Sequence, residues 1–213
     1  MVFEAIKKFK INQQKTPMFI LGFSLGGLIA THMMNSVMGR NMFSGLITIA
    51  PFYNDYEGIT GRLYKVTLPM SYIRPKLRLY GKAKYGPSEE YMEKYKDYYR
   101  ADNRIEFARI LTGVIFHQLH RGVKKCLSEG SHIPACFIVA AGDTRVCNQT
   151  IYEASREATH PQSELNVIAD ALHCNVNFEE QYLRQNVTYV LNFCDKILAS
   201  KSESKLEVAL ISK

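Results

Sequence analysis

A serine stands between glycines near the start of the chain, in the stretch GFSLG at residues 22–26. An apolar run precedes this stretch, and a helical pattern follows it. In a Gly-x-Ser-x-Gly turn the serine adopts a strained conformation that lifts its hydroxyl off the end of a strand, and the glycines leave room for neighbouring backbone. The next amide lies at a helix N-terminus, where negative charge is stabilised. The spacing therefore predicts a nucleophile, Ser24, beside an oxyanion donor, the Leu25 amide.

A serine hydroxyl is a weak nucleophile unless a base takes its proton. In the fold built on this turn, an Asp or Glu and then a His follow the serine, each at the carboxyl end of a strand. Asp143 follows the apolar run CFIVAAG, and His173 follows LNVIADAL. Asp170 and Asp195 are weaker candidates, because one falls in or just after a predicted strand and the other in a predicted helix. We expect His173 to act as general base and then acid, with Asp143 orienting its imidazole.

The other histidines are weaker candidates for a catalytic or metal-binding role. His32 lies about two helical turns beyond the serine, and His117 and His120 share a predicted helix face without an evident third metal ligand. Packing or surface roles are favoured for all three. No lysine or Walker pattern follows the glycine-rich turn, which disfavours a nucleotide site. We therefore expect neither a metal nor an organic cofactor.

The elements that must position these residues form a regular series. Apolar runs at residues 18–23, 43–52, 135–143 and 164–173 predict strands. Helical patterns span residues 24–38, ending at Gly39, and also residues 148–159 and 177–200. Residues 2–11 show a further helical period, with Val2, Phe3, Ile6 and Phe9 on one face and lysines on the other. Strands alternating with helices predict an α/β fold, in which helices flank a parallel sheet.

The series is interrupted between the second and third predicted strands. Residues 53–130 are rich in Tyr, Lys and Arg and contain helical periods, so we predict an inserted helical cap there. The α/β core then comprises residues 1–52 and 131–200, and residues 201–213 form a charged tail.

The composition of the chain indicates the compartment and the partners of the protein. The five cysteines are scattered and odd in number, which favours free thiols in a reducing compartment. The N-terminus lacks the apolar region of a signal peptide, and no window reaches the roughly 18 apolar residues of a membrane span. The net charge of +7 suits anionic partners, but no nucleic-acid-binding module accompanies it. We expect a cytoplasmic protein that binds no nucleic acid.

The motifs GFSLGG, AAGDTRV and ALHCNVNFE, with the helical insertion between the second and third strands, resemble the monoacylglycerol lipase and lysophospholipase group of α/β-hydrolases. The resemblance extends from about Val2 to about Leu198. It implies hydrolysis of single-chain lipid esters under a mobile cap, and it places Ser24, Asp143 and His173 on the triad and Leu25 on one of two oxyanion amides. Phe23 stands where the family often has histidine, and Cys174 where glutamate is usual.

The resemblance also implies that this chain starts just before the family's fifth strand. The preceding strands and a His-Gly loop with the second oxyanion amide would lie outside it. We expect the strand at residues 18–23 to form an apolar sheet edge that invites a protein partner. An alternative function follows, a catalytically silent module or a subunit of a larger assembly.

Part of the predicted cap has a composition suited to contact with a membrane surface. Residues 61–86 interleave basic with apolar and tyrosine side chains, as suits reversible contact with an anionic membrane surface. A solvated cap with an apolar underside is the other interpretation. Candidate residues for the apolar lining of the substrate pocket are Phe23, Leu25, Leu28, Ile73 and Phe116. Transfer of the acyl group to an alcohol would use the same catalytic residues as hydrolysis.

Overall fold

A computed structural model describes residues 17–53, 122–123, 125–129, 133–173 and 175–211, the last eleven of these by backbone alone. These residues belong to one compact unit formed from two parts of the chain, Met1–Asn54 and Gly122–Lys213. The predicted cap, residues 53–130, lies mostly outside the described residues and stays a prediction.

The described core contains a four-stranded sheet with the order β1-β2-β3-β4. Its strands are β1 (Phe19–Phe23), β2 (Gly45–Ile49), β3 (Ala135–Ala140) and β4 (Glu164–Ile168). All three pairings are parallel, and every residue of β2 and β3 is buried. Continuous apolar runs suit central parallel strands covered on both faces. The predicted α/β fold with a parallel sheet is thereby confirmed.

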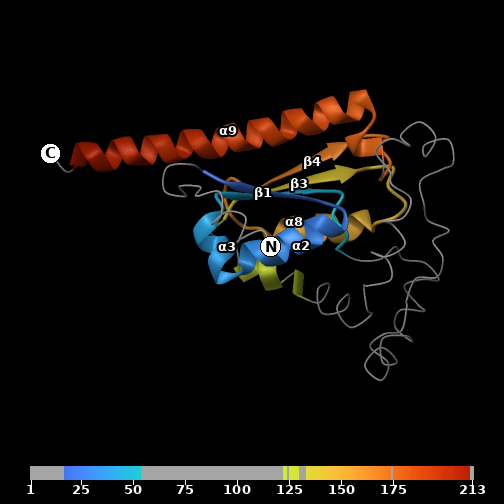
Figure 1. Cartoon of the computed structure of the whole chain (residues 1–213), viewed down its shortest axis with the longest axis horizontal. Coiled ribbons are helices and arrows are strands. Elements are labelled where there is room, and N and C mark those ends of the chain that lie inside the picture. Colours follow the sequence, from blue (N-terminus) through green and yellow to red (C-terminus); the bar gives the residue numbers. More distant parts are fainter. Residues whose placement is uncertain (1–16, 54–121, 124, 130–132, 174, 212–213) are drawn as a thin grey trace, which may run out of the picture. The chain divides into compact units, whose positions relative to one another are not determined.

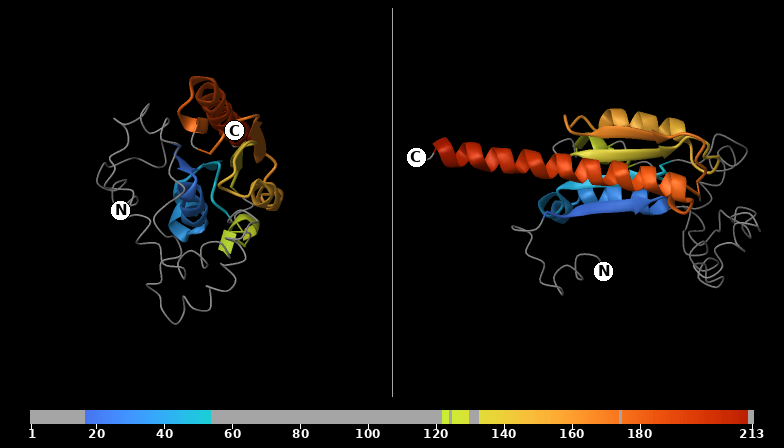
Figure 2. Two further views of the ribbon diagram at one scale, coloured as in Figure 1. Left: turned by 90° about the vertical axis from the view of Figure 1, so that its right-hand side faces the viewer. Right: turned by 90° about the horizontal axis from the view of Figure 1, so that it is seen from above.

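Helices lie on both faces of this sheet (Figure 1). Helix α2 (Leu25–Asn35), helix α3 (Val37–Met42) and helix α8 (Asn148–Glu157) lie on one face, and helix α9 (Glu180–Ile211) lies on the other. Helices α2 and α8 each belong to a strand–helix–strand connection, and right-handed crossovers in one direction put both on the same face. The views in Figure 2 show α9 running along the opposite face.

The predicted helix at residues 24–38 is wrong in its detail, because it is interrupted at Ser36 and continues as a second helix, α3. Ser36 has extended backbone dihedral angles, with φ −68° and ψ 153°, and its side chain accepts a hydrogen bond of 3.0 Å from the Gly39 N–H. A serine that caps a new helix offers the backbone an alternative to continuing the old one. Gly39 therefore lies inside α3 and does not end a helix.

Helix α9 also differs from expectation, since its backbone continues to Ile211, beyond the predicted boundary at residue 200. Residues 201–211 contain neither glycine nor proline and are rich in helix-forming Lys, Glu, Leu and Ala. Within the described residues, no helix combines the length and apolar character needed to cross a membrane.

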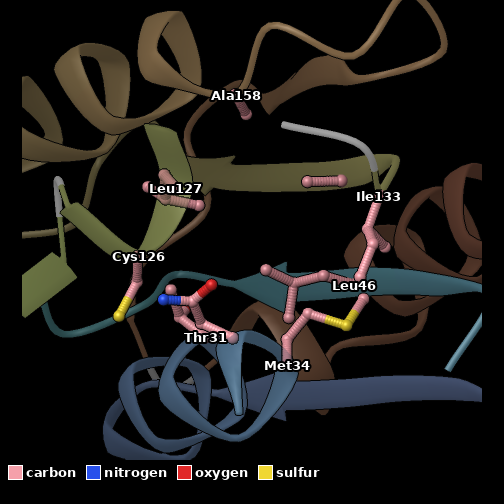
Figure 3. A pocket seen from close by; sticks show the side chains of 9 residues that line it. Thr31, Met34, Leu46, Cys126, Leu127, Ile133 and Ala158 are labelled. Carbon is pink, nitrogen blue, oxygen red and sulfur yellow. The ribbon is translucent and has the colours of Figure 1, made fainter. Parts of the chain in front are cut away.

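The core beneath α9 is a single apolar cluster. Phe193 and Ile197 of the helix pack on side chains from β2, β3 and β4, among them Ile47, Ile138 and Ile168, each at most 1% exposed. On the other face, a cavity of about 20 Å³ lies between α2, the sheet and residues 125–129 (Figure 3). It has room for about one water molecule. None of the predicted catalytic residues lines it.

Candidate active site

The turn between β1 and α2 holds Ser24 in a strained conformation, with φ 52° and ψ −122°. Its N–H donates to the carbonyl oxygen of Ile49 at 3.0 Å, and its own carbonyl oxygen accepts from the Phe52 N–H at 2.9 Å and the Gly27 N–H at 3.0 Å. A non-glycine residue with positive φ persists only where its surroundings fix it. Ile49 at the end of β2 and Phe52 just after it supply that restraint on the backbone of the turn.

The glycines around the serine differ in importance. A Cβ atom on Gly22 would collide with the carbonyl of Gly26, and one on Gly27 would lie 2.7 Å from the Cβ atom of Pro51. A Cβ atom on Gly26 would meet nothing within 4 Å. The expected need for space therefore holds at Gly22 but not at Gly26, and Gly27, outside the predicted motif, needs it as well.

Three side chains from separate parts of the sequence meet at the carboxyl ends of the strands. His173 Nε2 lies 2.8 Å from Ser24 Oγ, and His173 Nδ1 lies 2.5 Å from Asp143 Oδ2. The Asp143 side chain is completely buried, and that of His173 is 10% exposed. The structure thus brings Ser24, His173 and Asp143 into one hydrogen-bonded line.

Backbone groups orient the carboxylate of Asp143. Its Oδ1 atom accepts hydrogen bonds from the N–H groups of Arg145 at 2.7 Å and Val146 at 3.2 Å, which leaves Oδ2 for His173. An ionised carboxylate only accepts, so Nδ1 of a neutral imidazole carries the proton and Nε2 is left to accept from the serine hydroxyl. This tautomer is the one that a general base opposite a serine requires.

The loops that carry the acid and the base are tied together by their backbones. The Ala141 N–H donates to the carbonyl oxygen of Ile168 at 3.0 Å, and the Gly142 N–H to that of Ala171 at 2.9 Å. These bonds continue the pairing of β3 and β4 past the ends of the strands. They hold the Asp143 loop and the His173 loop in register, so the imidazole is positioned by the sheet itself.

Asn175 is a positioning residue that the sequence analysis missed. Its Oδ1 atom accepts from the Leu172 N–H at 2.6 Å, and its Nδ2 group donates to Glu179 Oε1 at 3.2 Å. The side chain thereby clamps the turn on both sides of His173. An asparagine two residues after the histidine was the available signal, since Asn side chains commonly bond to backbone groups a few residues away.

The predicted substrate-binding residues differ in their surroundings. The ring of half-buried Phe23 packs against the His173 imidazole, with centroids 5.1 Å apart and planes inclined by 32°. Leu25 is half-buried and is the first residue of α2. Its N–H therefore has no acceptor within the helix and lies at the N-terminus, where the helix dipole is positive. Leu28 is completely buried. Ile73 and Phe116 lie outside the described residues.

The rival candidates lie elsewhere. His32 Nδ1 is 3.4 Å from Cys126 Sγ, away from Ser24. Asp170 is exposed on its turn, and Asp195 lies in α9, so neither takes the place of Asp143 beside the imidazole. His117 and His120 lie outside the described residues, and the part of the chain that the structure describes holds no group of three or more His, Cys, Asp or Glu side chains placed to bind a metal.

Among the described cysteines, Cys126, Cys136, Cys147 and Cys194 are free. Cys136 and Cys147 are buried, whereas Cys126 and Cys194 are half-buried. Burial, reinforced by nearby Glu164, raises the pKa of Cys136 to about 12. Its thiol therefore stays protonated and acts as part of the core.

Comparison with known proteins agrees with this geometry. Residues 2–181 match the family described as serine aminopeptidase, S33. The chain is also similar in structure to a monoacylglycerol lipase from Paleococcus ferrophilus (13% identity, TM-score 0.63, covering 90% of this chain and 72% of that one). A monoglyceride lipase from Saccharomyces cerevisiae gives 14% identity and a TM-score of 0.69, with 92% of this chain and 66% of that one covered.

A thermostable carboxyl esterase from Bacillus coagulans is similar over 92% of this chain and 68% of its own, with 11% identity and a TM-score of 0.57. A search of curated protein sequences finds no match to the chain. The chain spans about two thirds of the length of these solved structures. The family match covers most of the chain, and the strand order and serine turn agree with it: the protein belongs to the S33 serine aminopeptidase family of α/β-hydrolases.

Proposed function

We propose that this protein is a serine ester hydrolase that cleaves single-chain lipid esters, such as monoacylglycerols or lysophospholipids. The observation that carries the proposal is the hydrogen-bonded line from Ser24 Oγ through His173 to Asp143, with distances of 2.8 and 2.5 Å. Such a line gives a serine hydroxyl the base that it lacks on its own. The ester class is supported by the solved structures similar to this chain, which are described as lipases and a carboxyl esterase.

The proposed reaction has two halves. His173 Nε2 takes the proton of Ser24 as Oγ attacks the ester carbonyl carbon, and the negative charge that develops on the carbonyl oxygen lies near the Leu25 N–H. Collapse of this intermediate breaks the ester bond, and His173 gives the proton to the departing alcohol. Water, deprotonated by His173, then attacks the acyl-serine, and the fatty acid leaves as His173 returns the proton to Ser24 Oγ. Asp143 stays ionised and stabilises the imidazolium in both halves.

The oxyanion site sets the expected rate. Oxyanion holes on this turn use two N–H donors, and the Leu25 N–H is the donor that we assign among the described residues. Removal of one donor typically lowers kcat by about 10²- to 10³-fold. The second candidate function is a catalytically silent module or a subunit of a larger assembly, in which the Ser24 turn is kept without turnover.

A fluorophosphonate probe, which reacts with activated serines, separates the two candidates. We expect labelling of the chain and none of Ser24→Ala. Ser44→Ala, a change at a serine outside the site, should label as the unchanged protein does. A folded chain that fails to label would favour the silent module.

A substrate series then tests the ester class. Monoacylglycerols, lysophosphatidylcholine and aminoacyl p-nitroanilides should be compared under one condition, with glycerol added in a parallel set. We expect release of fatty acid from the lipid esters and little cleavage of the anilides. Preferential cleavage of the anilides would overturn the ester assignment, and acyl-glycerol as the main product would indicate transfer to an alcohol.

We also infer reversible contact with anionic membrane surfaces through residues 61–86, which lie outside the described residues. The support is their alternation of basic with apolar and tyrosine side chains. Binding to vesicles containing phosphatidylserine should weaken as salt rises and in variants with Lys or Arg changed to Glu there. Binding that ignores both changes would contradict the inference.

A further inference from the structure

The loop that follows β2 crosses the beginning of α2 and restrains the Ser24 turn. The Phe52 N–H donates to the carbonyl oxygen of Ser24 at 2.9 Å. Loop and helix also approach closely, since a Cβ atom on Gly27 would lie 2.7 Å from the Cβ atom of Pro51. Ala50, where the loop begins, is completely buried and has a φ of 41°, a strained conformation that persists only where the surroundings fix it. The loop that restrains the serine therefore needs an anchor of its own.

The side chain of Tyr53 is such an anchor at the other end of the loop. Its hydroxyl oxygen lies 2.8 Å from Thr31 Oγ1 on α2. Its ring meets the ring of Phe137 on β3 edge to face, with centroids 6.5 Å apart. Tyr53 is 4% exposed and Thr31 is 2% exposed. Because a buried hydroxyl is costly without a hydrogen bond, this bond fixes the orientation of the tyrosine more strictly than apolar packing alone would.

The direction of the hydrogen bonds links Tyr53 to the start of α2. Thr31 Oγ1 donates to the carbonyl oxygen of Gly27 at 2.9 Å, and a hydroxyl has only one proton to donate. Tyr53 is therefore the donor to Thr31. Burial raises the pKa of Tyr53 to about 12, so its hydroxyl keeps the proton at neutral pH. The tyrosine hydroxyl is thereby connected, through one threonine, to the first turn of α2.

The loop at residues 50–53 thus acts on the serine turn by two routes. Its backbone bonds directly to the Ser24 carbonyl, and the Tyr53 side chain acts on the first turn of α2 through Thr31. Ser24 Oγ lies 2.8 Å from His173 Nε2, and a small displacement of a reacting group lowers the rate strongly. We propose that Tyr53 is a positioning residue for the nucleophile, which holds the loop and the start of α2 in the arrangement that keeps the Ser24 hydroxyl beside His173. This inference rests on the proposed function, because it requires Ser24 to react.

The kinetics of fluorophosphonate labelling test this role. Tyr53→Phe keeps the ring and removes the hydroxyl. We expect the maximal rate of labelling to fall about tenfold, while the probe concentration that gives half of this rate stays within about twofold. Thr31→Val removes the partner hydroxyl and should have the same effect, whereas Thr31→Ser keeps a hydroxyl and should recover most of the rate. Because the two side chains form one link, Tyr53→Phe combined with Thr31→Val should label no more slowly than Thr31→Val alone.

Two controls separate positioning from stability. Tyr189→Phe removes a hydroxyl from α9, which lies on the other face of the sheet, and should label at the original rate. Ile197→Val shortens a core side chain of α9 that is 1% exposed. Both Ile197→Val and Tyr53→Phe should lower Tm by roughly 2–4 °C, but only Tyr53→Phe should slow labelling.

Each contrary result has a distinct meaning. If the unchanged chain labels and Tyr53→Phe labels as fast as Tyr189→Phe, the positioning role is overturned and the proposed function stands. An equal loss of rate in Ile197→Val would assign the effect to stability and overturn positioning as well. A change confined to the half-maximal probe concentration would do so too, since it would report on probe binding. An unchanged chain that does not label would overturn the proposed function and this inference together.

Discussion

Strand β1 contributes to two very different parts of the molecule. The carboxyl end of β1 belongs to the rim, which is the edge of the sheet where Ser24, His173 and Asp143 meet. Backbone hydrogen bonds to Ile49, Gly27 and Phe52 restrain the Ser24 turn there. The Ser24 hydroxyl is hydrogen-bonded to His173, and His173 is hydrogen-bonded to the buried Asp143. Along its side, β1 pairs with β2 alone among the described strands, and Leu21 is 51% exposed. The rim is held by hydrogen bonds between described residues, whereas the lateral edge of β1 has no described strand beside it.

This difference teaches that the site and the edge have separate requirements. The hydrogen bonds that join Ser24, His173 and Asp143 lie within the four described strands and their loops. An uncovered apolar edge tends to recruit other polypeptide. The predicted protein partner at this edge stays a prediction.

The largest expected effect tests the rim. Replacing His173 by Gln removes the base that accepts the Ser24 proton, and we expect the rate of fluorophosphonate labelling to fall by about 10⁴-fold or more. His32→Gln is the matched control, because His32 faces Cys126, and its labelling should be unchanged. If both variants label alike and circular dichroism shows both folded, the rim does not work as a catalytic unit.

The glycines of the serine turn allow a crowded position and an open one to be compared. Gly22→Ala places a Cβ atom against the Gly26 carbonyl, and we expect the free energy of unfolding to fall by about 3 kcal/mol. Gly26→Ala adds a methyl group in open space within α2 and should raise it by about 0.5–1 kcal/mol. Urea unfolding measures both changes. A reversed order would show that the strained turn is not the restrictive part.

Asn175 tests whether the loop around the base is rigid by construction. Asn175→Ala leaves the Leu172 N–H without its acceptor, which should cost about 1–2 kcal/mol of unfolding free energy and slow labelling by roughly tenfold. Glu179→Gln retains an acceptor oxygen for the Asn175 amide and should label normally. Slow labelling that persists when stability is restored by sucrose, an osmolyte that is excluded from the protein surface, would indicate a positioning role beyond stability.

The smallest expected effect concerns the ring beside the base. Phe23→Ala removes the aromatic contact with His173, worth about 1 kcal/mol, and should slow labelling by about fivefold. Phe23→Tyr keeps the ring face and should label at the original rate. If Tyr and Ala are equally slow, the ring contact does not position the imidazole.

Much of this protein follows from its sequence. The apolar runs predicted all four strands, and the alternation of strands with helices predicted their parallel pairing. Continuous burial on both faces holds for β2 and β3, whereas β4 alternates between buried or half-buried and exposed residues. The order Ser24, Asp143, His173 placed each residue after a strand, and the carboxyl ends of parallel strands share one edge of the sheet. Local spacing was sufficient for these predictions, since each rests on a few neighbouring residues.

Other features were decided by tertiary contacts. The break at Ser36 and the different demands at Gly22 and Gly26 depend on which backbone passes nearby, and a helical pattern does not record that. The clamp by Asn175 joins two segments of a folded turn, so its importance is visible only when Leu172 and Glu179 lie beside it. Sequence specifies periodicity and order, whereas distances between segments arise from packing.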